Sequence, residues 1–228
     1  MCGISGYIGN QKIEDSILKK TLSLMKNRGP DSQNTYKINV KKTNLYLLHS
    51  RLSIIDLTEY ANQPFSSFDK TLIFNGEIYN YLELKKKLLK KGYIFKTKSD
   101  TEVLLKMLNF YGEKAFKYLD GMWSMAYYNF KRNELILSRD RFGEKPLYYF
   151  KNNNELYFSN SIKALNILSN VKLRFNKKKI ESLIKYPDKS IGLNENSIFE
   201  NIYQLKSSEC LKISINNNKY TTCLSLYL

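Results

Sequence analysis

The first nine residues, MCGISGYIG (Met1–Gly9), determine how the rest of the chain is interpreted. The short apolar stretch from Gly3 to Ile8 predicts a β-strand. Cys2 directly follows the initiator methionine, so removal of Met1 would leave a thiol and a free α-amine on one residue. Such an amine has a reference pKa of about 7.7–8.0 and the thiol about 8.5, so the amine can accept the thiol proton near neutral pH. The alternative is that Cys2 is an ordinary small residue buried in a first strand.

The composition indicates a globular protein that is long enough to bury a sizeable core. The chain has 228 residues, of which 43% are hydrophobic and 14% aromatic. No run approaches the roughly 18 apolar residues of a membrane helix, and no signal peptide is recognisable at the start. The cysteines at positions 2, 210 and 223 are too few and too scattered for a disulfide framework or a zinc site. We therefore expect a cytoplasmic protein without a metal site.

The formal net charge of +16 raises the question of nucleic-acid binding. Of the 37 basic residues, 31 are lysines and only six are arginines, and they are spread along the whole chain. Short lysine clusters at 85–87 and 177–179 fall on helix-like segments and indicate solvated helix faces. Because no nucleic-acid motif accompanies the charge, we expect no specific nucleic-acid partner.

Hydrophobic periodicity predicts alternating groups of helices and strands. Asn75-Gly76 suits a tight turn, and Ser99 to Glu102 has the pattern of a capping box at the start of a helix. Hairpin-like loops at 129–133 and 151–154 indicate antiparallel pairing, so the expected fold class is α+β. The domain is expected to span 1–185, with 186–228 as an extension or linker. Helices are expected at 13–25, 79–91, 100–111, 113–119, 161–168 and 177–185, and strands at 3–8, 45–48, 52–57, 71–74, 122–128, 134–138, 147–150, 155–159, 203–205 and 210–215.

Seven strings carry a joint resemblance that runs over nearly the whole chain. In order they resemble the glutamine-hydrolysing domain of asparagine synthetases, which belongs to the class II glutamine amidotransferases and the N-terminal-nucleophile hydrolases. The resemblance implies a four-layer αββα sandwich with two antiparallel sheets. The strings are MCGISGYIG (1–9), NRGPD (27–31), HSRLSIIDL (49–57), FNGEIYNY (74–81), KSDTEVLL (98–105), LDGMWSMAYYN (119–129) and RDRFGEKPLYY (139–149).

The resemblance also implies hydrolysis of glutamine to glutamate and ammonia, without a metal or cofactor for that step. The thiol would attack the side-chain amide, the α-amine would accept its proton, and an Asn-Gly pair would bind the oxyanion. The implied catalytic residues are Cys2, Asn75 and Gly76, and the implied glutamine-binding residues are Arg51, Glu77 and Asp100. Other interpretations stay open at three positions, namely Asn75-Gly76 as a simple turn, Asp100 as a helix cap, and His49 as a rival base or a structural residue.

Three departures from the family pattern concern a loop and the end of the chain. Asn27 stands where histidine is usual before RGPD, and Asn34 where glycine is common, so one loop near the pocket is altered. The SGG-x-DS loop of the family's synthetase domain, which uses ATP and Mg²⁺, is absent. We expect 186–228 to lead toward such a domain or subunit. The alternatives are an amidotransferase for another acceptor, such as a sugar acid, or a non-catalytic remnant. A homodimer is left open.

Overall fold

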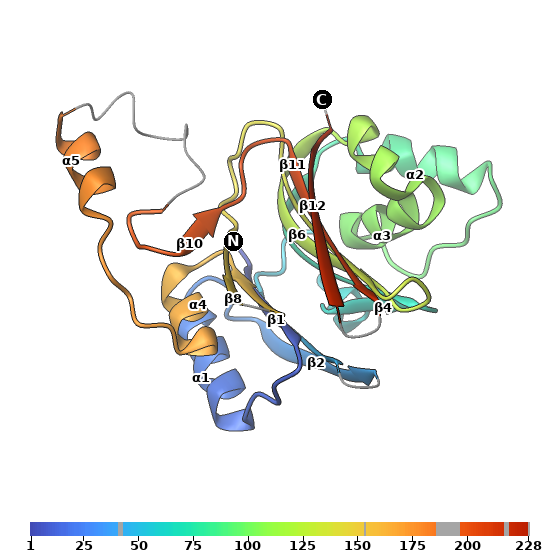
Figure 1. Cartoon of the computed structure of the whole chain (residues 1–228). Coiled ribbons are helices and arrows are strands. Elements are labelled where there is room, and N and C mark those ends of the chain that lie inside the picture. The colour runs from blue at the N-terminus through green and yellow to red at the C-terminus, as the bar shows by residue number, and fades with distance from the viewer. Residues whose placement is uncertain (41–42, 153, 186–196, 217–218, 228) are drawn as a thin grey trace.

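The computed structural model describes residues 1–40, 43–152, 154–185, 197–216 and 219–227, and it has four layers. Two antiparallel six-stranded sheets pack face to face, and helices cover the outer face of each one (Figure 1). One sheet has the strand order β10-β8-β9-β1-β3-β2, and the other has the order β12-β11-β7-β6-β5-β4. The expected α+β class and αββα sandwich are confirmed.

The first sheet is built around the N-terminal strand. β1 pairs with β3 through Gly3↔Ser50 and with β9 through Ser5↔Ser159, and all seven of its residues are buried. Full burial explains why its sequence is a nearly continuous apolar run instead of an alternating one. The strands of this sheet are β1 (Gly3–Gly9), β2 (Ser32–Val40), β3 (Thr43–Arg51), β8 (Tyr148–Asn152), β9 (Glu155–Ser159) and β10 (Ile202–Gln204), and its covering helices are α1 (Asp15–Met25) and α4 (Ile162–Ser169).

The second sheet carries the remaining described strands, and two helices cover its outer face. Its strands are β4 (Phe65–Ser67), β5 (Lys70–Ile78), β6 (Gly121–Asn129), β7 (Glu134–Arg139), β11 (Glu209–Asn216) and β12 (Lys219–Leu226). The helices are α2 (Tyr81–Leu89) and α3 (Asp100–Tyr111). Further short elements are α5 (Lys177–Lys185) and the 3₁₀ helices Glu59–Ala61 and Gly112–Tyr118. Figure 1 shows α5 at the periphery, away from the sheets.

The alternation of side chains along β5 places the candidate site between the sheets. Leu72 and Phe74 belong to the core under α2 and α3, whereas Ile73 belongs to the core between the two sheets. Because successive strand residues point to opposite faces, Asn75 shares the inter-sheet face with Ile73. Ile4 of β1 lies in the same inter-sheet core. The strand pattern therefore directs Asn75 toward the layer in which β1 lies.

Three local predictions were wrong, the first two because pairing with other strands overrides local sequence signals. Asn75-Gly76 is not a turn, since both residues lie inside β5 and pair with Ser124 and Trp123 of β6. The segment His49–Arg51 does not interrupt a strand, since β3 continues through it and pairs with both β1 and β2. The expected strand at 52–57 is absent from the described secondary structure.

Further differences concern the start of α3, Asn34 and the C-terminal part. Ser99 caps α3 by accepting from Thr101 N, but Glu102 does not return to the Ser99 N–H as a capping box requires. Asn34 lies in β2 and not in a loop. Residues 202–226, expected as part of a linker, add strands to both sheets. Within the described residues, no helix is long and apolar enough to cross a membrane. Residues 186–196 of the expected linker lie outside the described residues.

Candidate active site

One pocket is lined by all six residues that the sequence analysis singled out. They come from the start of β1, the end of β3, the second half of β5 and the first turn of α3. These segments are distant in sequence, and the packing of the two sheets brings them together. The six residues are Cys2, Arg51, Asn75, Gly76, Glu77 and Asp100.

Cys2 is held at the entrance to β1 by contacts to its main chain and its thiol. Its carbonyl oxygen accepts from Asn160 Nδ2 at 2.9 Å and from Arg28 Nε at 3.4 Å. Asn160 Oδ1 in turn accepts from Ile4 N at 3.1 Å, so one side-chain amide binds both peptide groups around the start of the strand. The Cys2 Sγ accepts from Leu52 N at 3.4 Å. Burial raises the pKa of the thiol, so a nearby base is needed to ionise it at neutral pH.

Asn75 offers an amide whose hydrogen-bonding capacity is largely unused. Its side chain is buried, Nδ2 lies 3.4 Å from Ser124 Oγ, and Oδ1 has no hydrogen-bond partner. Ser124 is the residue directly opposite on β6. A buried amide left this incomplete can bind a ligand in the pocket without first breaking strong bonds.

Gly76 allows β5 and β6 to approach each other closely beside the pocket. A Cβ atom built at this position would lie 2.0 Å from the carbonyl oxygen of Met122 and 2.7 Å from Trp123 Cα. Any side chain here would force the two strands apart. Glycine is therefore required by close backbone packing and not by a positive φ angle.

Arg51 has a guanidinium group that is buried and fixed by backbone and side-chain acceptors. Nη1 donates to Thr58 O at 2.9 Å and to Asn62 Oδ1 at 2.8 Å, and Nη2 donates to Asp56 O. These contacts use three of the five N–H groups, which leaves Nε–H and one Nη2–H. A guanidinium with free N–H groups suits a carboxylate, which can accept two bonds from arginine.

Asp100 supplies a buried carboxylate to the same pocket. Burial raises its pKa to about 6, although hydrogen bonds from Ile78 N, Thr101 N and Ser99 act in the opposite direction. The Glu77 carboxylate, which also lines the pocket, contributes a further increase. A buried carboxylate with incomplete compensation favours a cationic partner, because the partner's charge stabilises the ionised form.

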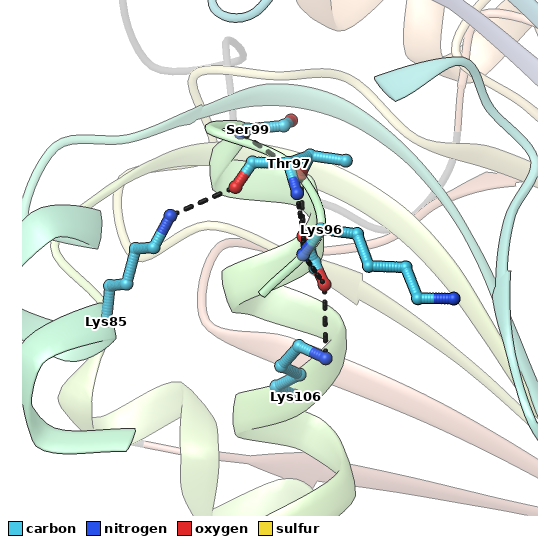
Figure 2. A network of polar contacts seen from close by, with 6 residues as sticks. Lys85, Lys96, Thr97, Ser99 and Lys106 are labelled. Atoms are coloured by element: carbon cyan, nitrogen blue, oxygen red, sulfur yellow. Dashed lines mark hydrogen bonds and ion pairs between the residues drawn. The ribbon is translucent and has the colours of Figure 1, made fainter. Parts of the chain in front are cut away.

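A second carboxylate, Glu102, fixes the backbone that leads into Asp100. It accepts from Lys96 N at 3.1 Å, from Thr97 N and Thr97 Oγ1 at 2.7 Å each, and forms an ion pair of 3.1 Å with Lys106. Lys85 adds a bond of 3.0 Å to the carbonyl oxygen of Thr97, so the loop is held from both sides (Figure 2). The network therefore supports the position of Asp100 from outside the pocket.

His49 is a structural residue in this arrangement. It is fully buried, its Nε2 lies 3.3 Å from Phe74 O, and it does not line the pocket. Burial lowers its pKa to about 3, so the ring is neutral at physiological pH. A neutral ring that bonds a carbonyl oxygen donates from Nε2. His49 thus links the two sheets.

The loop of residues 27–31 contacts the main chain at Cys2 and at Ser53. Arg28 contacts the Cys2 carbonyl, and Asp31 Oδ2 accepts from Ser53 N at 2.7 Å. Gly29 is required by packing, since a Cβ there would lie 2.1 Å from Ser50 O. Asn27 is exposed and does not line the pocket. The Asn27 departure therefore leaves the described pocket lining unchanged.

Three further residues of the pocket were missed by the sequence analysis. Leu52 contacts the thiol through its backbone, and Gln63 bridges Phe74 N and Thr101 Oγ1. Neither role has a sequence signal, because both depend on tertiary contacts. Lys145 also lines the pocket, and it lies in the string RDRFGEKPLYY, which the sequence analysis used only for the resemblance.

A comparison with known families agrees with the geometry. The model of the glutamine amidotransferase domain matches residues 1–224. The chain belongs to this family. The match includes β10, β11 and nearly all of β12, so the strands beyond residue 200 lie within the matched region of the amidotransferase.

Relatives of this amidotransferase include glutamine-hydrolysing asparagine synthetases. Asparagine synthetase 1 of Bacillus subtilis (strain 168) is 39% identical over 177 residues, covering 75% of this chain and 27% of the relative. Asparagine synthetase 2 of the same organism is 36% identical over 234 residues, covering 97% of this chain and 30% of the relative. The chain thus spans less than a third of the length of these two proteins.

The fold of this amidotransferase is also similar to that of a solved enzyme. The glutamine phosphoribosylpyrophosphate amidotransferase from B. subtilis aligns with a TM-score of 0.71 at 16% identity. The alignment covers 100% of this chain and 49% of that structure. At this identity the likeness concerns the fold, and it agrees with the two-sheet architecture described above.

Proposed function

We propose that the chain, once Met1 is removed, hydrolyses glutamine to glutamate and ammonia with Cys2 as the nucleophile. The observation that carries this proposal is the convergence of a thiol, a partly unpaired amide, a guanidinium and a carboxylate on one pocket. Glutamine carries matching groups, namely a side-chain amide to be attacked, an α-carboxylate and an α-ammonium. Family membership supports the same substrate.

In the proposed mechanism, the Cys2 sulfur attacks the side-chain carbonyl carbon of glutamine. The α-amine of Cys2 accepts the thiol proton and later delivers a proton to the departing ammonia. Asn75 Nδ2 and the Gly76 N–H donate to the oxyanion, and each such donor is typically worth about 10²–10³ in rate. A γ-glutamyl thioester forms, and water then attacks it to release glutamate and regenerate the thiol.

The two charged residues hold the backbone end of the substrate. Arg51 has two N–H groups left for the α-carboxylate, and Asp100 provides a negative charge for the α-ammonium. Glu77 lies beside Asp100 and adds negative charge to the same side of the pocket. This division of charges selects a free amino acid over a peptide-bound glutamine, which lacks both terminal charges.

We further propose that the ammonia serves asparagine synthesis from aspartate and ATP. This rests on the relatives, which are asparagine synthetases that are much longer than this chain. A separate synthetase domain or subunit would then be the partner, ATP and Mg²⁺ would be used there and not in the glutamine step, and a cytoplasmic location is expected. An acceptor other than aspartate is the competing proposal, since the acceptor site lies outside the pocket described here.

The glutaminase step is tested on chain released with Cys2 as its first residue from a cleavable fusion. We expect glutamate release from this form and background rates from Cys2→Ala and from a form that keeps Met1. Cys210→Ala is the matched control, because Cys210 is buried under α2 and α3 and does not line the pocket. Glutamate release that persists in Cys2→Ala would contradict the proposed nucleophile, and full activity with Met1 retained would contradict the α-amine as base.

The acceptor is tested by following nitrogen from amide-¹⁵N-labelled glutamine in extracts of the native cells with aspartate and ATP added. Depletion of this chain with an antibody should reduce labelling of asparagine, and re-addition should restore it. Unchanged labelling of asparagine, with loss of label from another amidated product, would instead favour the competing acceptor.

A further inference from the structure

The loop between β7 and β8 is fixed by a buried carboxylate. Asp140 is fully buried, and its two oxygens accept from the backbone N–H groups of Trp123, Phe142, Glu144 and Lys145 at 2.9–3.2 Å. Arg139 Nε also donates to the carbonyl oxygen of Lys145 at 2.8 Å. These bonds involve the main chain of Lys145 only. The position of its Cα is therefore set independently of its side chain.

The side chain of Lys145 points at the residue that precedes the nucleophile. It is only 7% exposed, lines the pocket, and its Nζ lies 3.1 Å from the Met1 sulfur. Within the described part of the chain, Lys145 Nζ has no carboxylate within ion-pair distance. A lysine buried to this extent usually has a charged partner. This one instead faces the N-terminus.

Covalent geometry limits the distance between this ammonium group and the Cys2 nitrogen. Five bonds separate the Met1 sulfur from the Cys2 nitrogen, a span of at most about 6 Å. Together with the 3.1 Å contact, Lys145 Nζ lies within roughly 9 Å of that nitrogen. Loss of Met1 removes the sulfur. The Lys145 side-chain amine and the α-amine of Cys2 are then no longer separated by the Met1 side chain. A positive charge at this range disfavours a second positive charge.

We propose that Lys145 is a positioning residue whose positive charge holds the α-amine of mature Cys2 in its uncharged, proton-accepting form. The inference rests on the proposed function, because it requires removal of Met1 and the α-amine as base. Lys145 acts through Cys2 and makes no bond to glutamine. Its contribution is to keep the base available at a lower pH than an isolated N-terminal amine would allow.

Other charged and titratable groups also surround Cys2, and they stay constant in the comparison. Arg28 contacts the Cys2 carbonyl and adds positive charge, as does Arg51, whereas two carboxylates add negative charge. His49 is neutral, and the Asp140 carboxylate is bonded to backbone N–H groups. Differences between variants at position 145 therefore report the lysine charge. The groups that stay constant are the Cys2 thiol, Arg28, His49, Arg51, Glu77, Asp100 and Asp140.

The test measures the titration of the amine directly, without glutamine. Protein labelled with [¹⁵N]cysteine and released with Cys2 as first residue has one titrating cysteine nitrogen, because the nitrogens of Cys210 and Cys223 are amides. Lys145→Met keeps the length of the stem and removes the charge. We expect its titration midpoint to rise by about 1–2 pH units, from Coulomb repulsion at up to roughly 9 Å with an effective dielectric constant of ~20.

Two matched variants complete the experiment. Lys145→Arg keeps the charge and should titrate within about 0.2 pH units of the wild type, since charge and not shape carries the effect. Lys163→Met removes an exposed lysine from α4 and should also leave the midpoint unchanged. In kinetics, the acidic limb of kcat/KM should move to higher pH in Lys145→Met only.

The outcomes separate this inference from the proposed function. A midpoint in Lys145→Met equal to that of the wild type would overturn the role of Lys145, whether or not the chain hydrolyses glutamine. An equal rise in Lys163→Met would overturn it too, because the effect would then be one of net charge. A raised midpoint in a chain without glutaminase activity would retain the electrostatic role and refute the proposed function alone.

Discussion

Replacing Asp100 by asparagine should stabilise the fold while it weakens glutamine binding. Burial raises the pKa of Asp100 to about 6, from the ordinary aspartate value of 3.8. The folded state therefore binds the proton more tightly than the unfolded state does. The resulting cost to the folded state is absent below pH 3.8, grows as the pH rises toward 6, and is constant above that.

The size of the effect follows from this shift. A difference of about 2.2 pH units corresponds to roughly 3 kcal/mol at pH 8, and to about half of that at pH 5. Asparagine avoids this cost because it does not ionise, and its side-chain oxygen can still accept from Ile78 N. For a chain of this length, a gain of about 3 kcal/mol should raise Tm by roughly 6–12 °C. Loss of the charge should raise KM for glutamine by about 10–100-fold.

Chemical denaturation at pH 8 and pH 5, together with glutaminase kinetics, measures both consequences. Asp120→Asn is the matched control, since Asp120 is exposed and should change stability by less than about 0.5 kcal/mol at either pH. An Asp100→Asn variant no more stable than the wild type at pH 8 would contradict the cost of burying the charge. So would a gain in stability that is the same at pH 5 as at pH 8.

Substitutions at three further positions test the support of the pocket. Gly76→Ala places a methyl group 2.0 Å from Met122 O. It should lower the free energy of unfolding by about 3 kcal/mol and glutaminase activity by more than about 100-fold. Near-normal activity would contradict the close approach of the two strands. Glu102→Gln weakens the bonds to the loop before Asp100. It should lower the free energy of unfolding by about 1–3 kcal/mol and raise KM for glutamine more than it lowers kcat. A fall in kcat alone would contradict the role of Glu102 in supporting Asp100. Asn160→Asp replaces the donor to the Cys2 carbonyl by an acceptor and should lower kcat at least about tenfold with little change in KM, whereas Asn160→Gln should keep part of the activity.

The sequence predicted those parts of the fold that depend on local pattern. The apolar run of β1 and the serine cap of α3 were located correctly, because burial and capping leave direct marks on the residues involved. β2 and β12 were missed although each forms a hairpin with a strand next to it in sequence, because their apolar alternation is short, as in Tyr36, Ile38 and Val40, and lies among polar residues. Asn75-Gly76 was misread as a turn for a different reason, since the need for glycine arises from Met122 on a neighbouring strand that is distant in sequence.

The candidate site was predicted only through the family strings, and tertiary contacts account for the remainder. Spacing alone does not place Cys2, Arg51 and Asp100 around one pocket. That requires two sheets packed face to face, with β3 adjacent to β1. The contacts of Asn160 and Lys145 with the N-terminal segment cross more than 140 positions of sequence, and no local pattern reports such distances.

The central place of β1 orders events during synthesis of the chain. β1 pairs with β9, and Cys2 is held by Asn160, so the first strand cannot be locked until residues near 160 have left the ribosome. At about 5–20 residues per second, this takes roughly 8–30 s after synthesis begins. Throughout that interval β1 lacks its β9 partner and Cys2 lacks its Asn160 contact, so Met1 stays open to an aminopeptidase even if β1 has paired with β3. The long sequence separation between the nucleophile and its anchors therefore gives maturation a period in which to occur before folding closes around Cys2.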